Sequence, residues 1–184
     1  LIYEAARSGA DAVKFQNWIT EDFISDQKQL FEYKSLNRSV TEPLYDLFKR
    51  NELQRQWLPE LYNLCHQEKI DFMSTPMSYE GVDDLISLGV DVIKNGSDCL
   101  SHIPLIKYIA EKAKVIILST GMSDQKDIDY AVEAVLSSNP NCIPVLLHCT
   151  SIYPTPVDEA NLKRMMALSQ KYNVKVGYSD HTVG

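Results

Sequence analysis

From residue 70 onward, short β-rich apolar runs alternate with segments of helical periodicity. This alternation is typical of parallel strands joined by right-handed helical crossovers, so the sequence predicts an α/β protein. The predicted strands are Ala12–Gln16, Asp71–Thr75, Val92–Lys94, Val115–Ser119, Val145–His148 and Val174–Tyr178. The predicted helices are Leu53–Gln67, Tyr79–Leu88, Ile103–Glu111, Gln125–Ser137 and Glu159–Lys171.

The segment Thr20–Arg50 does not follow this alternation. It is polar and rich in tyrosine and charge, and we expect a long excursion between a strand and a helix, with short helices near Glu42–Lys49. Long insertions at strand ends often carry substrate contacts, and the other interpretation is a solvated surface loop.

Polar side chains follow the apolar body of every predicted strand. They are Lys14 and Gln16, Ser74 and Thr75, Lys94 and Ser97, Ser119 and Thr120, His148 with Thr150 and Ser151, and Ser179 with Asp180 and His181. In a (β/α)8 barrel the carboxyl ends of all strands meet on one face, where such residues can surround a ligand. A doubly wound sheet usually carries a glycine-rich phosphate fingerprint after its first strand, and this sequence has none. The sequence therefore predicts an α/β (β/α)8 TIM barrel.

The two ends of the sequence favour an incomplete barrel. The chain opens inside a segment of helical periodicity without an initiator Met, and it stops just after a motif-rich strand end. We therefore expect one partial barrel domain over residues 1–184, with the first and last strands of the barrel outside it.

Composition narrows the possible functions. At 184 residues and 45% hydrophobic, the chain can form one substantial core. A net charge of -7 with scattered basic residues argues against nucleic-acid binding, although a few focused cations can still bind a small anion. The cysteines lack CxxC spacing, which favours reduced thiols, and the sequence shows neither a membrane-length apolar run nor the pattern of a signal peptide. We expect a soluble, cytoplasmic protein without a membrane partner.

Two lysines and a set of neutral donors predict an anion site. Lys14 and Lys94 would be costly at strand ends unless each faced an anion or a carboxylate. Hydroxyls and turn N–H groups can satisfy the remaining oxygens of a phosphate. These donors are the hydroxyls of Thr75, Ser97 and Ser119 and the N–H groups of the turns Gly96-Ser97 and Thr120-Gly121. Each hydroxyl taken alone could instead cap the helix that follows its strand.

Histidine and tyrosine supply the remaining candidates. A neutral His181 at a strand end could bind a divalent metal, with Asp180 orienting a neighbour, or it could be a packed or capping residue. His148 is expected to be a satisfied residue of the barrel interior rather than a ligand. The prolines after Tyr153 predict an extended turn, which would hold this ring over the barrel mouth or form an aromatic plug at a helix entry.

Taken in order, these clusters resemble the catalytic domain of the N-acetylneuraminate (sialic acid) synthases and of relatives that make other nonulosonic acids. The matching stretches are Gly9-Ala10-Asp11-Ala12-Val13-Lys14-Phe15-Gln16, Ser74-Thr75-Pro76, Lys94–Ser97, Leu118-Ser119-Thr120-Gly121-Met122, Leu146–Pro156 and Val176–Thr182. The resemblance implies a barrel enzyme that condenses phosphoenolpyruvate with an N-acetylated amino sugar such as N-acetylmannosamine and releases phosphate. It also implies a homodimer, in which a small antifreeze-like domain, absent from this chain, completes the partner's site.

The resemblance further implies roles for individual residues. The implied catalytic residues are Lys14, Lys94 and His181, and the implied substrate-binding residues are Gln16, Thr75, Ser97, Ser119, Ser151, Tyr153 and Ser179. The two lysines and most of the hydroxyls would contact phosphoenolpyruvate, whereas Gln16 and Tyr153 would hold the amino sugar. His181 would be one of two histidine ligands to a divalent metal, usually manganese with magnesium as the other candidate, and this metal would polarise the sugar aldehyde.

Two positions depart from the family pattern. Asp98 and Cys99 stand where many relatives carry an acid shortly after the Lys-x-Gly-Ser turn, so either Asp98 takes over the acidic role or that role is lost. Ser151 stands where some relatives have Asn, which shortens the reach of any hydrogen bond. Two other functions stay open: another phosphoenolpyruvate-aldose synthase, of the 9-phosphate or 3-deoxy octulosonate type, and a noncatalytic barrel that binds a sugar phosphate.

Overall fold

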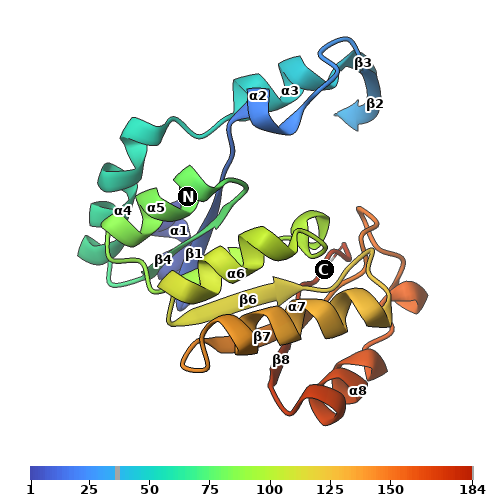
Figure 1. Cartoon of the computed structure of the whole chain (residues 1–184). Helices are drawn as coiled ribbons and strands as arrows, with labels where there is room; N and C mark the ends of the chain where they lie inside the picture. The colour runs from blue at the N-terminus through green and yellow to red at the C-terminus, as the bar shows by residue number, and fades with distance from the viewer. Residues whose placement is uncertain (36–37, 184) are drawn as a thin grey trace. The chain divides into compact units, whose positions relative to one another are not determined.

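The structure, a computed structural model, describes residues 1–35 and 38–183. The chain forms two compact units, Leu1–Phe72 and Met73–Gly184, and each unit is described by itself (Figure 1). Strand β4 (Asp71–Pro76) begins in the first unit and ends in the second. No described helix has both the length and the apolar character that a membrane crossing requires.

The first unit combines short helices with two kinds of strand. Its elements are α1 (Ile2–Arg7), β1 (Ala12–Asn17), α2 (Thr20–Phe23), β2 (Leu30–Ser35), β3 (Arg38–Pro43), α3 (Leu44–Asn51), η1 (Arg55–Trp57) and α4 (Leu58–Gln67). The N–H of Asp71 donates to the carbonyl of Asp11 over 2.9 Å, which joins the approach to β1 to the start of β4. The ring of Phe72 stacks on Phe15 of β1 and meets Tyr62 of α4 edge-on, so these aromatic rings pack strand against helix.

The segment Thr20–Arg50, expected as a long excursion with short helices, also contains an antiparallel hairpin. Strands β2 and β3 pair with Tyr33 opposite Val40, and the helix expected near Glu42–Lys49 is confirmed as α3. Glu42 accepts a hydrogen bond of 2.7 Å from the Tyr33 hydroxyl and pairs with Arg50 of α3. Arg50 and then Tyr33 lower the pKa of Glu42 to about 2. This network connects the hairpin to α3, because one carboxylate contacts both.

The second unit follows the predicted alternation of strands and helices. After β4 come α5 (Tyr79–Ser87), β5 (Val92–Asn95), η2 (Ser97–Cys99), α6 (Ile103–Lys112), β6 (Val115–Ser119), α7 (Gln125–Ser138), β7 (Ile143–His148), η3 (Val157–Glu159), α8 (Lys163–Tyr172) and β8 (Lys175–Tyr178). The predicted strands and helices are confirmed, with boundaries that differ by a few residues. The largest difference in this unit is at α8, which begins at Lys163 rather than at the predicted Glu159, and Glu159 is instead the last residue of the separate 3-10 helix η3.

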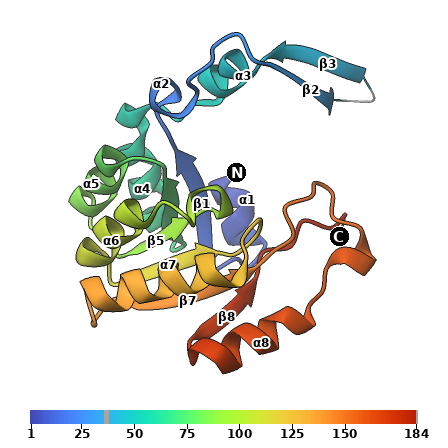
Figure 2. The same ribbon diagram turned by 45° about the vertical axis from the view of Figure 1, so that its right-hand side comes forward.

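The parallel sheet has six strands in the order β1-β4-β5-β6-β7-β8. Its last two strands, β7 and β8, can be followed in Figure 2. Apart from the inserted β2–β3 hairpin, each strand neighbours the next one along the chain, and the pairs from β4 to β8 are parallel. A doubly wound sheet would reverse its strand order at a switch point, whereas a (β/α)8 barrel keeps this sequential order. The α/β class and the parallel sheet are confirmed, and closure into a barrel stays a prediction.

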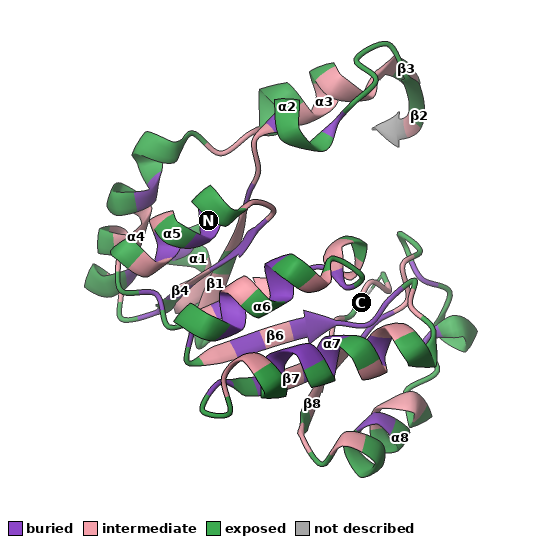
Figure 3. Cartoon of the chain, in the orientation of Figure 1, coloured by how far each residue is buried: buried purple, intermediate pink, exposed green. Residues whose placement is uncertain are grey.

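Strand register assigns side chains of the second unit to two faces of the sheet. Ile93, Ile116, Leu118 and Leu146 are fully buried on one face, where α6 and α7 contact β6 and β7 (Figure 3). Burying an aliphatic side chain of this size stabilises a fold by about 1.5–3 kcal/mol. Because side chains alternate along a strand, Lys94 and Ser119 lie on the opposite face. Lys94 pairs with Ile117 and Ser119 pairs with Leu147. Ser119 is buried, and the other three residues are half-buried.

His148 corrects one prediction. It follows Leu147 in β7, so its side chain lies on the same face as Leu146 and not on the opposite face, which would line the interior of the predicted barrel. Its ring is buried, and Nε2 lies 2.8 Å from the carbonyl oxygen of Ala160. Nδ1 has no hydrogen-bond partner among the described residues. His148 was expected to have its hydrogen bonds satisfied, and this holds for Nε2 but not for Nδ1.

Candidate functional site

The connections after β5, β6 and β7 meet at Gly121. The N–H of Gly121 donates to Ser97 Oγ over 3.0 Å, and Ser97 Oγ lies 3.3 Å from Cys149 Sγ. A Cβ added to Gly121 would overlap Ser151 Oγ and lie 2.9 Å from both Cys149 Sγ and Ser97 Oγ. The backbone of Gly121 therefore fits closely among these side chains. We call Ser97, Gly121, Cys149 and Ser151 the glycine cluster.

Lys94 supplies a cation beside this cluster. It lies near the end of β5, on the face of the sheet opposite to Ile93 and Ile116. It forms no ion pair with a described carboxylate. Burial lowers the pKa of Lys94, and the nearby Cys149 and Asp98 act in the opposite direction. A desolvated ammonium group of this kind gains most from an anionic ligand, because the ligand would replace the lost hydration.

Two buried hydroxyls near the strand ends are not hydrogen-bonded. Thr75 in β4 and Ser119 at the end of β6 are 3% and 2% exposed, and neither hydroxyl has a partner among the described residues. Leaving a buried polar group unpaired costs about 1–3 kcal/mol, so such groups favour a site that a ligand or water completes.

The alternative that strand-end hydroxyls cap the next helix is wrong for Thr75, Ser97 and Ser119. Ser78 caps α5, the imidazole of His102 caps α6, and Asp124 caps α7 through a capping box. Ser97 accepts its hydrogen bond from a turn N–H of a different connection. These hydroxyls are therefore free of the capping role that a strand-end position would suggest.

His181 is held in one tautomer by the β7–α8 connection. Its Nδ1 lies 2.8 Å from the Thr150 carbonyl oxygen, which can only accept, so Nδ1 carries the proton. Nε2 then presents a lone pair, 3.3 Å from Ser179 Oγ. The ring of Tyr153 stacks on the imidazole at a centroid distance of 4.2 Å. The predicted residues Tyr153, Ser179 and His181 are thus brought together.

The geometry of His181 suits one ligand of the predicted divalent metal, but the described residues do not form a complete metal site. The Nε2 lone pair of His181 suits one bond to a divalent metal, and the Nδ1 contact is the usual partner of a ligating imidazole. However, no group of three or more His, Cys, Asp or Glu residues that could hold a metal occurs among residues 1–35 and 38–183. His181 can therefore be one ligand, and a complete site would need ligands from elsewhere.

Lys14 and Gln16 belong to the first unit. Lys14 was predicted at the end of its strand. It lies instead in the middle of β1, because this strand continues to Asn17. It is exposed, and its ammonium group donates to the Phe15 carbonyl over 3.3 Å. Gln16 is half-buried. Their convergence with Lys94, which is in the second unit, stays a prediction.

The two residues that depart from the family pattern behave differently from each other. Asp98 is exposed and its carboxylate lies over the backbone of Gly96, where an added Cβ would overlap Oδ1. Burial, and then the charge of Asp98, raises the pKa of Cys99 to about 11. The Cys99 thiol therefore stays protonated near neutral pH and is a poor nucleophile. Asp98 is the group of the pair that can carry an acidic role.

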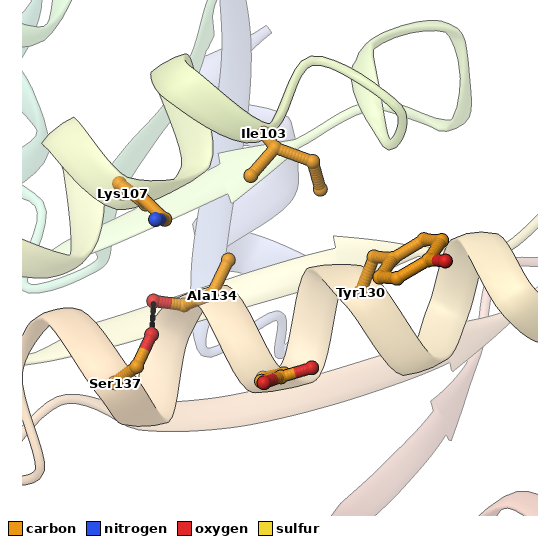
Figure 4. A pocket seen from close by; sticks show the side chains of 6 residues that line it. Ile103, Lys107, Tyr130, Ala134 and Ser137 are labelled. Carbon is orange, nitrogen blue, oxygen red and sulfur yellow. Dashed lines mark hydrogen bonds between the residues drawn. The ribbon is translucent and has the colours of Figure 1, made fainter.

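A separate pocket of about 180 Å³ lies between α6 and α7 (Figure 4). It is lined by Ile103, Lys107, Tyr130, Glu133, Ala134 and Ser137. None of these was predicted as a site residue, and the Ser137 hydroxyl is already bonded to the Ala134 carbonyl. The pocket offers no unpaired buried polar group, in contrast to the strand ends.

Two residues that organise the site, Gly121 and Thr155, were not among the predicted site residues. Gly121 was noted only for its N–H, and its lack of a side chain proves equally important. Thr155, which is 3% exposed, donates its N–H to the His181 carbonyl over 2.7 Å and its hydroxyl to the Ile152 carbonyl over 2.8 Å. Its position between Pro154 and Pro156 could have indicated this role. Proline has no backbone N–H, so Thr155 must supply the backbone donor of this part of the loop.

Gly121→Ala should disrupt the glycine cluster. The added methyl group cannot fit without moving Ser97, Cys149 and Ser151, and overpacking of this kind costs about 1–3 kcal/mol. We expect a lower midpoint in thermal or urea unfolding. Gly177→Ala is the matched control, since its Cβ would meet only the flexible end of Leu147, at 2.8 Å. Equal losses of stability in the two variants would contradict the close fit at Gly121.

The sequentially ordered parallel sheet defines an α/β protein, which carries a desolvated lysine and two buried hydroxyls without a described hydrogen-bond partner near its strand ends. The chain belongs to the NeuB family, which matches residues 1–184. This confirms the resemblance to the nonulosonic acid synthases.

Individual relatives agree with the family assignment. An uncharacterized protein of Methanocaldococcus jannaschii is 42% identical over 184 residues, covering 100% of this chain and 50% of that protein. The N,N'-diacetyllegionaminic acid synthase of Legionella pneumophila is 37% identical over 187 residues, covering 100% of this chain and 52% of that protein. The crystal structure of an N-acetylneuraminic acid synthetase from Leptospira borgpetersenii, in complex with citrate, is similar with a TM-score of 0.86 and 29% identity, covering 100% of this chain and 59% of that one. The chain thus spans about half the length of the curated relatives it matches.

Proposed function

We propose that the complete protein is a nonulosonic acid synthase that condenses phosphoenolpyruvate with an N-acetylated amino sugar. The observation that carries this proposal is the desolvated Lys94 beside the glycine cluster, in a chain of the NeuB family. Lys94, the unpaired hydroxyls of Thr75 and Ser119, and the Ser97 hydroxyl are the groups that would hold the phosphate or carboxylate of phosphoenolpyruvate.

The proposed reaction forms a carbon–carbon bond between the substrates and a carbon–oxygen bond from water to C2, and it breaks the C2–O bond to phosphate. C3 of phosphoenolpyruvate attacks the aldehyde carbon of the open-chain sugar, whose oxygen takes up a proton to become a hydroxyl, and positive charge is left at C2. Water adds to C2 and gives up its two protons, one balancing the new hydroxyl and one leaving with phosphate, as the tetrahedral intermediate expels inorganic phosphate to give the 2-oxo acid. Lys94 and the hydroxyls would stabilise the negative charge on the phosphoenolpyruvate oxygens as these bonds change.

A divalent metal, manganese or magnesium, is part of the proposal and would supply Lewis acidity toward the sugar aldehyde when bound. Within the described chain His181 would hold it through Nε2, with the Thr150 carbonyl fixing the ring. Tyr153, stacked on this imidazole, would contact the sugar together with Gln16, and Ser151 and Ser179 would line the same region. We further expect the complete protein to act as a homodimer in the cytoplasm.

The decisive assay is the mass of the product formed by the complete protein. Phosphoenolpyruvate, manganese and a panel of N-acetylated hexosamines, free and 6-phosphorylated, should yield a product equal in mass to sugar plus pyruvate, with one phosphate released per product. Omission of phosphoenolpyruvate should abolish it. Binding of sugar without phosphate release would favour the noncatalytic sugar-phosphate-binding protein, and turnover only with a 6-phosphorylated sugar or a pentose phosphate would favour the related synthases.

A further inference from the structure

We propose that Thr155 is a positioning residue that holds His181 and Tyr153 together as one preassembled unit. This inference rests on the proposed function for its catalytic meaning. Its structural basis is a set of hydrogen bonds between the connection after β7 and the segment after β8, two parts of the second unit that are far apart in sequence.

Thr155 holds the segment after β8 through its backbone. Its N–H donates to the His181 carbonyl over 2.7 Å, the shortest of the bonds that join these two segments. This contact fixes the main chain at His181, and the Thr150 carbonyl fixes the side chain of the same residue through Nδ1. The imidazole is therefore restrained at both its backbone and its ring.

The Thr155 hydroxyl holds the other side of this arrangement. It lies 2.8 Å from the Ile152 carbonyl oxygen and 3.3 Å from the Thr150 carbonyl oxygen, the same atom that accepts from His181 Nδ1. These contacts close the turn that carries Tyr153, whose ring stacks on the imidazole of His181. Because Thr155 is only 3% exposed, water cannot readily replace its hydroxyl.

The consequence is a fixed direction for the His181 Nε2 lone pair. Without the Thr155 hydroxyl, the turn from residue 150 to residue 155 loses a buried donor, and the Thr150 carbonyl is no longer held toward Nδ1. Both tautomers of the imidazole then become accessible. Residues that orient a ligating histidine from behind typically change metal affinity by about 10–100-fold when they are removed.

The test uses Thr155→Val in the complete protein, with Thr155→Ser as the rescue variant. Thr150→Val is the matched control, because that hydroxyl comes from the same turn but donates to the Glu159 carbonyl over 3.0 Å. Long-range 1H–15N spectra of the metal-free protein should show one His181 tautomer, with the proton on Nδ1, in the wild type, Thr155→Ser and Thr150→Val. Thr155→Val should show a mixture of tautomers.

Manganese titration supplies the second readout. The manganese Kd should rise about 10–100-fold in Thr155→Val and recover in Thr155→Ser, while the KM for phosphoenolpyruvate changes less than about twofold. A single unchanged tautomer in Thr155→Val, or a parallel rise of both constants, would overturn the proposal. If Thr155→Val does not fold, Thr155→Ala is judged by the same criteria. A wild type that binds no manganese contradicts the metal role, and the tautomer spectra still decide the role of Thr155.

Discussion

Lys94→Ala in the complete protein will raise the KM for phosphoenolpyruvate by about 100-fold, because removing one partner of a desolvated charge pair costs about 2–5 kcal/mol of binding. Lys94 is the cation that the second unit places beside the glycine cluster. Burial has removed part of its hydration, so an anion that reaches it gains a stronger interaction than it would with an exposed lysine. The KM for the sugar should change much less. Steady-state kinetics with each substrate varied in turn separates the two effects.

Lys114→Ala is the matched control for this variant. Lys114 is exposed and paired with Asp91 over 2.6 Å at the opposite ends of the strands. Its removal should leave both KM values unchanged. An unchanged KM for phosphoenolpyruvate in Lys94→Ala would refute the role of Lys94 in anion binding.

The affinity for phosphoenolpyruvate should also depend on pH through Lys94. Burial lowers the pKa of this ammonium group, so it loses its proton at a lower pH than an ordinary lysine does. Affinity should therefore fall as pH rises through the lowered pKa, at a lower pH than an ordinary lysine would give. In Lys94→Ala this alkaline decline should disappear, and its persistence would assign the decline to another group.

His181→Gln should have the second large effect. Glutamine cannot present the imidazole lone pair that points away from the Thr150 carbonyl, so the complete protein should lose its manganese and at least about 100-fold in kcat. Metal analysis of the purified, dialysed variant measures the first loss directly. Thermal unfolding should show that the fold persists.

The control for the metal measurement is His66→Gln. His66 is an exposed histidine on α4, so its removal changes the histidine count without touching the segment after β8. Manganese content should match that of the wild type. Stoichiometric manganese in His181→Gln would count against ligation by His181.

Periodicity predicted the strands and helices of the second unit because each strand there is a short apolar run bounded by turn residues. Ile116 and Leu118 are fully buried as an inner-face pair, and Asp124 starts α7 with a capping box that can be read from the sequence. The polar residues that follow the predicted strands include Ser97 and Ser151, and the structure brings these two together in the glycine cluster. Chain order alone allowed this, because parallel strands all end at the same edge.

Features that depend on pairing partners were harder to predict. The β2–β3 hairpin has Tyr33 opposite Val40, but its strands are interrupted by charges and polar residues and lack a continuous apolar face. The face of His148 depends on a one-residue register that composition cannot fix. The importance of Thr155 arises from contacts with His181, which is 26 positions later in the printed sequence.

A crystal structure of the complete protein with phosphoenolpyruvate tests the central claim most directly, because it shows which side chains surround the ligand. We expect phosphoenolpyruvate oxygens within hydrogen-bonding distance of Lys94 Nζ and of the Ser119 hydroxyl. Phosphoenolpyruvate bound away from these two side chains would contradict the proposed anion site.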